Sequence, residues 1–273
     1  MLFLLGMLLA SAAFLGCRAY GTRPLVLAAP IVGLLFGLQL ELTVGLAPVV
    51  GLLFGLQLER RHSYGRIVAG AALPGGLLAL WLLMAAYSGL QREEQVEELV
   101  RQLQAMGLAA AEEGNSLREL AMTGLRLRPS TEFISLMLMA VLAYRLGFAA
   151  AARLGLGVPR PLPLARWKPW PELIWLLIAG FALKLVGSGF LEELGLNLLV
   201  VMVAVYAVHG VAVTRFYAAR LGLPRLLEAL VYGLLAMTAG LSVMLLALVG
   251  LLDTRFDWRH LETPPADDAG TAA

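Results

Sequence analysis

The sequence contains little charge and almost no cysteine or histidine. Only 15% of its 273 residues are charged, whereas an ordinary soluble domain has about 25%. A single cysteine, Cys17, cannot form an internal disulfide, and three histidines on separate segments do not suggest a metal centre. Basic residues number 21 against 19 acidic ones, without a basic block, which argues against a nucleic-acid-binding protein.

Apolar residues make up 60% of the chain, and they occur in long runs. Runs of about 20 apolar residues can cross a bilayer as helices. We place such runs at roughly 1–16, 24–58 (two short spans), 66–88, 132–152, 173–190, 195–217 and 228–252. This pattern predicts an all-α, polytopic transmembrane helical bundle with about eight membrane segments (roughly six to eight). Residues 1–260 would form one membrane domain, and 261–273 a disordered tail.

One substantial polar stretch, 89–130, separates the fourth and fifth expected spans. Within it, apolar residues recur at helical spacing over 93–106, and charged residues, mainly glutamates, lie at other positions, so we expect an amphipathic helix. Its acidic face does not suit anionic lipid, and it would cover its own bundle or meet a partner helix. Pro129-Ser130-Thr131-Glu132 has the composition of an N-cap that opens the next span.

Two nearly identical segments lie 18 residues apart, APIVGLLFGLQLE from Ala29 and APVVGLLFGLQLE from Ala47. Each contains a Gly-x-x-x-Gly spacing, Gly33/Gly37 and Gly51/Gly55, which allows helices to approach closely. We interpret the repeat as a tandem duplication that adds packing surface. These glycine helices and the 93–106 helix are the candidate contacts for a membrane partner or a homo-oligomer, besides the lipid bilayer.

Basic residues are concentrated in alternate loops, which predicts the orientation of the spans. These residues are Arg18, Arg23, Arg60, Arg61, Arg66, Arg153, Arg160, Arg166, Lys168, Arg215, Arg220 and Arg225. The loops between them carry Glu41, Glu192 and Glu193 instead. The basic loops should be cytoplasmic, and with eight spans both ends of the chain would lie outside.

Four polar residues fall within the late spans and are the candidate ligand-binding residues: Lys184, Asn197, Tyr206 and His209. Polar and ionisable groups at membrane depth are costly and often functional. Each also has an ordinary interpretation. Lys184 could reach the interface or pair with Glu192 or Glu193, and His209 could be hydrogen-bonded within the bundle.

A charged motif, Asp253-Thr254-Arg255-Phe256-Asp257-Trp258-Arg259, follows the last span. Asp253 and Asp257 share one helical face, as do Arg255 and Arg259. We expect this structural charge cluster to pair with a loop arginine such as Arg126 or Arg128. The alternative is an interfacial anchor with solvated charges.

The sequence contains none of the enzyme motifs sought, whether a Gly-rich phosphate loop, His-Glu-x-x-His or Gly-x-Ser-x-Gly. We therefore expect no enzymatic activity, no cofactor and no metal.

The C-terminal half carries a recognisable succession of motifs. PLPLARWKPWPELIW from Pro161 leads to Tyr206-x-x-His209-Gly210 and closes on Leu251-Leu252-Asp253-Thr254. This succession resembles the YybS-like family of predicted bacterial membrane proteins, whose function is unknown. That family is distantly similar to the S-components of energy-coupling-factor transporters and to the cell-shape protein MreD.

Two functions are compatible with these observations. The resemblance implies an inner-membrane protein that binds or transports a small solute in the manner of an S-component. The alternative is a non-catalytic scaffold of a cell-envelope complex, for which the glycine-rich and amphipathic helices would supply contact surfaces.

Overall fold

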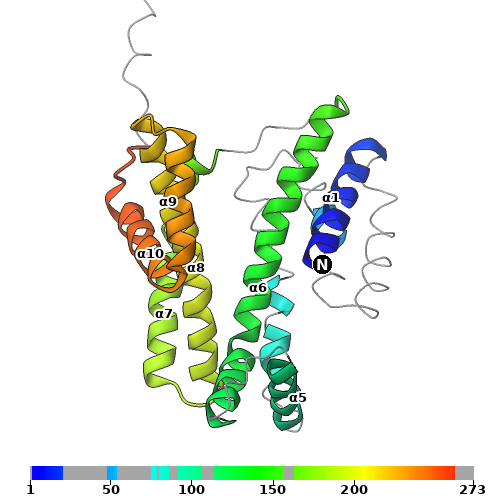
Figure 1. Cartoon of the computed structure of the whole chain (residues 1–273), viewed down its shortest axis with the longest axis vertical. Helices are drawn as coiled ribbons and strands as arrows, with labels where there is room; N and C mark the ends of the chain where they lie inside the picture. The colour runs from blue at the N-terminus through cyan, green and yellow to red at the C-terminus, as the bar shows by residue number, and fades with distance from the viewer. Residues whose placement is uncertain are drawn as a thin grey trace, which may run out of the picture.

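A computed structural model describes residues 2–20, 48–53, 75–78, 80–85, 92–105, 114–156 and 163–261. Within these ranges the chain is helical, with no β-strand. Figure 1 labels the α-helices α1 (Leu2–Tyr20), α5 (Arg92–Ala105), α6 (Gly114–Arg153), α7 (Leu173–Val186), α8 (Phe190–Arg220), α9 (Arg225–Met237) and α10 (Ala239–Phe256). A short 3-10 helix, η1 (Leu164–Arg166), precedes α7. The prediction of an all-α chain therefore holds for the described residues.

The helices pack in two groups that meet where α6 lies beside α8 (Figure 1). In the first group, α1 packs on α6, and Phe14 contacts Tyr144 in the buried core between them. In the second, α7 and α10 pack against α8 around Met202, Tyr206 and Ala247. Outward-facing apolar side chains cover α7, α9 and α10, as expected for helices surrounded by lipid.

Two helices are long and apolar enough to cross a membrane, within Leu117–Arg153 and Phe190–Arg220. The bent pair α9–α10 would make a third if it counts as one span. Leu4–Cys17, Gly75–Ala85 and Leu173–Val186 are shorter apolar helices. The described residues thus support a membrane protein but do not confirm six to eight spans. Most of the duplicated segment, including Gly33, Gly37 and Gly55, lies outside the described residues.

The predicted amphipathic helix is present as α5, and its apolar side faces its own chain. Val96 is buried, Leu99 and Leu103 are half-buried, and α5 packs against α6. Glu93 and Glu97 lie on the exposed side. Among the described residues α5 therefore packs on the first part of α6 of its own chain, and the expectation of a partner helix stays a prediction.

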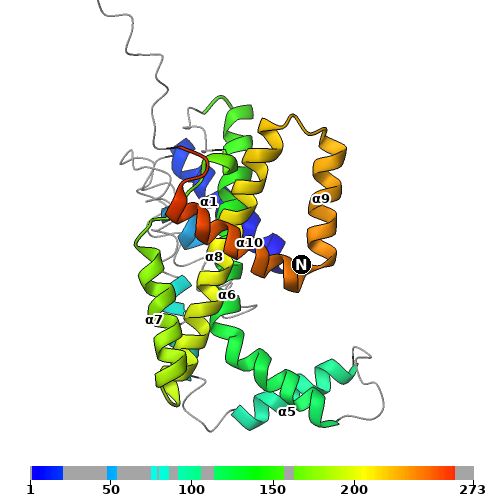
Figure 2. The same cartoon turned by 90° about the vertical axis from the view of Figure 1, so that its left-hand side faces the viewer.

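The prediction that a helix begins at Pro129 is wrong. α6 starts at Gly114 and continues through Pro129 to Arg153. Proline usually ends or kinks a helix because it lacks an N–H group and its ring crowds the preceding turn. Here α6 bends instead of ending. Its first part turns away from the bundle and lies beside α5 (Figure 2).

The expected span at 228–252 is helical but sharply bent. The chain breaks at Thr238, and the two helical pieces on either side meet at 113°. α10 therefore turns back toward the end of the molecule from which α9 started. There the Tyr217 hydroxyl of α8 donates to the Trp258 carbonyl (3.1 Å), and Lys168 pairs with Asp257 (3.1 Å).

This return corrects the predicted position of the chain end. The sequence placed the closing motif across the membrane from the loops that contain Lys168 and Arg220. In the structure it lies at the same end as Lys168 and the last turn of α8. Counting 228–252 as a full crossing produced the error.

Candidate functional site

The C-terminal motif folds into a compact polar cluster at the end of α10, which we call the clasp (His209, Asp253, Thr254 and Arg259). α10 ends at Phe256, and Asp257 takes a left-handed conformation with φ of 44°. Asp and Asn tolerate this conformation better than most residues. The resulting reversal brings Arg259 back over the last turn of α10, within reach of Asp253.

Arg259 is the centre of the clasp, and only 3% of its surface is exposed. Its Nε donates to Asp253 Oδ2 (3.0 Å), and its Nη2 lies 2.9 Å from the same oxygen. Nη1 donates to the carbonyl of Ala165 (2.7 Å) and Nη2 to that of Trp167 (3.1 Å). Arg259 therefore ties the loop around η1 to the end of α10.

His209 supplies the contact from α8, and its ring is fully buried. Arg259 Nη2 lies 2.6 Å from His209 Nε2 and has only protons to offer, so Nε2 accepts. The proton of the neutral ring is then on Nδ1, which donates to Thr254 Oγ1 (3.1 Å), and Thr254 donates to the carbonyl of Gly250 (3.0 Å). With this tautomer the His209 ring is uncharged, and the negative charge of Asp253 balances the positive charge of Arg259.

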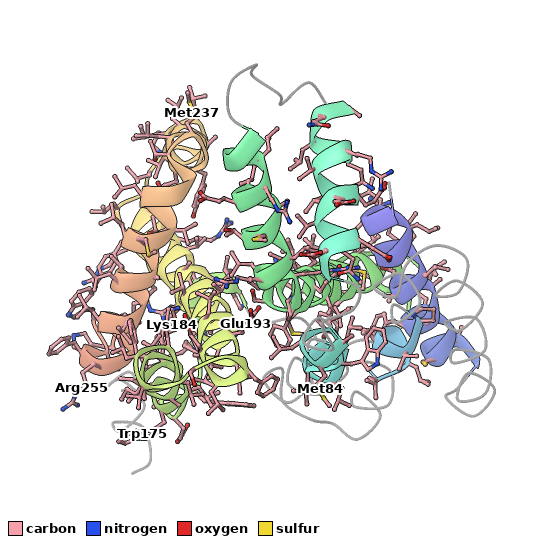
Figure 3. The ribbon with its side chains drawn as sticks, turned by 90° about the horizontal axis from the view of Figure 1, so that it is seen from below. Met84, Trp175, Lys184, Glu193, Met237 and Arg255 are labelled. Atoms are coloured by element: carbon pink, nitrogen blue, oxygen red, sulfur yellow. The ribbon has the colours of Figure 1, made fainter. Side chains whose placement is uncertain are left out.

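Contacts around the clasp hold it at one end of the bundle. Trp167 meets the His209 ring edge-on, with 5.9 Å between ring centroids, and the rings of Phe256 and Trp258 stack. Arg255 points away from the bundle (Figure 3). The motif is thus neither a row of solvated charges nor uniformly exposed.

The expected pairing of the motif with Arg126 or Arg128 is wrong. Asp253 pairs with Arg259 of its own motif, and Asp257 pairs with Lys168. Arg126 instead lies 3.6 Å from Glu193, at the start of α8. The error has the same origin as the misplaced chain end, because α10 returns to the loop of Lys168.

Close helix packing brings these residues together. A Cβ at Gly210 of α8 would overlap the backbone of Leu246, and one at Gly250 of α10 would overlap the carbonyl oxygen of Tyr206. The two helices therefore cross with their backbones in contact, as small residues permit in membranes. This crossing places His209 next to Asp253.

Two buried polar atoms in this region have no hydrogen-bond partner among the described residues, Asp253 Oδ1 and the Tyr206 hydroxyl. Unpaired buried polar atoms are rare in native structures and each needs an explanation. Within the same described ranges, no three His, Cys, Asp or Glu side chains converge as a metal site would require.

The other predicted ligand residues lie elsewhere and serve other contacts. Lys184 pairs with Glu192 across the turn between α7 and α8, as one sequence interpretation expected. Figure 3 shows Lys184 and Glu193 near this turn. Asn197 is buried against α6, where its amide bonds to the backbone of Arg126 and Ser130. Lys184, Asn197 and His209 therefore do not form one pocket.

Family comparison agrees with the membrane architecture. A family model described as "Predicted membrane protein (DUF2232)" matches residues 1–254. The chain belongs to this family. A comparison with curated proteins and with solved structures gives no match.

Proposed function

We propose that this DUF2232 protein binds and moves a small solute across the bacterial inner membrane, in the manner of an S-component that works with a separate energising partner. The observation that carries the proposal is the helix break at Thr238. α9 has 13 residues and is therefore about 20 Å long, in a hydrocarbon core of about 30 Å. The break thus falls inside the bilayer.

Thr238 itself keeps its backbone bonds, to the Leu234 carbonyl and from the Ser242 N–H. The helix ends on either side of it are an interruption that the surroundings must accommodate. Irregular backbone is tolerated in the hydrocarbon region where protein buries it or where it lines a water-filled cavity. Met237, at the break, is 88% exposed, so the described residues do not bury this side chain. Discontinuous helices of this kind commonly form the solute sites of transporters.

The clasp adds a second argument. Asp253 and His209 are fully buried on helices that pack within the bundle. Ionisable groups buried within a membrane bundle commonly pair with one another, and they are by default a functional-site hypothesis. The unpaired Asp253 Oδ1 leaves one acceptor of this group available.

Water access to the break tests the proposal. Gly240→Cys, in a Cys17→Ser background, should react with a small water-soluble thiol reagent in membrane vesicles. Leu248→Cys, on an outward-facing position of α10, is the control and should react slowly. Equal protection of both cysteines would contradict a water-lined break. A thermal-shift screen of vitamins and nucleoside-like solutes would then seek the ligand, which should raise the melting temperature.

A scaffold of an envelope complex is the second candidate. It is favoured by α5 and the first half of α6, which extend away from the bundle (Figure 2) and expose Leu120 and Met122. A scaffold predicts a stoichiometric membrane partner that cross-links to this region. It also predicts that Gly240→Cys is shielded from water by that partner.

A further inference from the structure

A side chain of α8 bonds to the backbone of α6 at a point where the backbone hydrogen bonds of α6 are interrupted. Pro129 lies within the 40-residue helix and has no N–H. In an uninterrupted helix the Ser130 N–H would bond to the carbonyl of Arg126, four residues earlier. Here the Ser130 N–H donates to Asn197 Oδ1 (3.0 Å), and the Arg126 carbonyl accepts from Asn197 Nδ2 (2.9 Å).

The Asn197 amide thus lies between the Ser130 N–H and the Arg126 carbonyl, which would bond to each other in an uninterrupted helix. It offers an acceptor to the N–H and a donor to the carbonyl, so only one orientation of the amide fits. Nδ2 also donates to the Glu193 carbonyl of its own helix (2.9 Å), which holds the side chain in place. Asn197 is buried, so water does not readily replace these bonds.

Hydroxyl groups satisfy other backbone groups at the bend. Ser130 Oγ donates to the Leu127 carbonyl (2.8 Å), and Thr131 Oγ1 lies within bonding distance of the carbonyls of Leu127 and Arg128 (3.1 and 2.9 Å). Side chains that satisfy freed carbonyls are what allow a proline bend to persist in a membrane helix.

The bend carries an arm, defined as α5 together with residues 114–129 of α6. Val96 is buried and Leu99 faces Gly124, so α5 and this part of α6 are packed together. Across the bend, the arm is tied to α8 by the Asn197 amide and by the Arg126–Glu193 ion pair (3.6 Å). Figure 2 shows the arm turning away from the rest of α6.

We propose that Asn197 is the latch of a hinge at Pro129. With the amide inserted, α6 is bent and the base of the arm is held beside the first turns of α8 by Asn197 and Glu193. With the amide withdrawn, the Ser130 N–H pairs with the Arg126 carbonyl, α6 straightens and the arm swings away. The inserted amide makes two hydrogen bonds with the α6 backbone. The straight arrangement replaces them with one backbone bond, and the withdrawn amide bonds to water or to another partner. This device does not depend on any solute and goes beyond the proposed transport function.

Distance measurements between spin labels test the latch. One label replaces Gln95, exposed on α5, and the other replaces Val186, exposed at the end of α7, in full-length Cys17→Ser protein in lipid. The arm's part of α6 has 16 residues and is about 24 Å long, so a 20° change at the hinge moves its far end by about 8 Å. Asn197→Leu should shift or split the distance distribution by about this amount.

A matched control comes from the same helix. Thr214 Oγ1 donates to the Gly210 carbonyl of α8 (2.9 Å), and Thr214→Val should leave the distribution unchanged. Pro129→Ala restores the missing N–H and should shift the distance in the same direction as Asn197→Leu. If Asn197→Leu does not fold, Asn197→Ala, which also removes the amide, is measured in its place. Wild-type distances in the folded variants would overturn the latch.

Discussion

Arg259 reaches back across six residues to pair with Asp253, and both side chains are almost completely buried. In a continuous helix, positions six apart do not share a face. The left-handed residue Asp257 between them ends α10 and makes the pairing geometrically accessible. The same guanidinium binds the carbonyls of Ala165 and Trp167, so one side chain holds three parts of the chain together.

The two aspartates of the motif should therefore differ in their effect on stability. Asp253→Asn leaves Arg259 as an uncompensated buried charge, which costs about 3–5 kcal/mol of unfolding free energy. Asp257→Asn removes a partly exposed pair with Lys168 and should cost at most about 1 kcal/mol. Unfolding in mixed detergent micelles measures both values.

A double variant separates the charge from the packing. Asp253→Leu with Arg259→Met removes both charges and should be less destabilising than either single change, because no charge is left unpaired. Arg255→Gln, at an exposed position, should leave the stability unchanged. Equal losses at Asp253 and Asp257 would mean that burial does not govern the motif.

The α8–α10 crossing gives a second prediction. Gly210→Ala and Gly250→Ala each place a Cβ against the backbone of the facing helix and should cost about 1–3 kcal/mol through overpacking. Gly233 of α9 has no atom within 4 Å of the corresponding position. Gly233→Ala should therefore be neutral or stabilise by up to about 1 kcal/mol through helix propensity. Melting curves of the three variants compare them directly.

The apolar runs were enough to predict the helical class and the approximate position of most described helices. The positions of the polar residues depended on backbone geometry that periodicity does not encode. Pro129 has the composition of a helix start, yet Asn197, far away in sequence, lets the helix continue. Gly240 stands just after the break at Thr238, but glycine is also common in unbroken membrane helices, so the sequence did not mark the break and the closing motif was misplaced.

The loop around Trp167 and Lys168 is the part of the site that the sequence interpretation did not assign to the clasp. In the sequence, Trp167 and Lys168 belong to the stretch on which the family resemblance rests. The carbonyls of Ala165 and Trp167, which accept hydrogen bonds from Arg259, are backbone groups that every residue type has. A polar backbone partner of this kind could not have been predicted from the sequence.

The return of α10 yields a prediction about sidedness. Arg255 and Arg220 should lie on the same side of the membrane, and Val186, at the other end of α7, on the opposite side. Because basic residues favour the cytoplasm, single cysteines at Arg255 and Arg220 should resist an impermeant maleimide in intact cells. Val186→Cys should react. Labelling of Arg255→Cys together with Val186→Cys would show that α9–α10 crosses the bilayer.

The Tyr206 hydroxyl separates a structural role from a ligand-binding role. The side chain is 1% exposed, and its hydroxyl has no hydrogen-bond partner among the described residues. An unsatisfied buried polar group costs about 1–3 kcal/mol, so Tyr206→Phe should leave the melting temperature of the solute-free protein unchanged or raise it. If a solute bonds to this hydroxyl, the same variant should lose the stabilisation that the solute gives the wild type. A lower melting temperature without solute would instead show that the hydroxyl already has a partner in the folded protein.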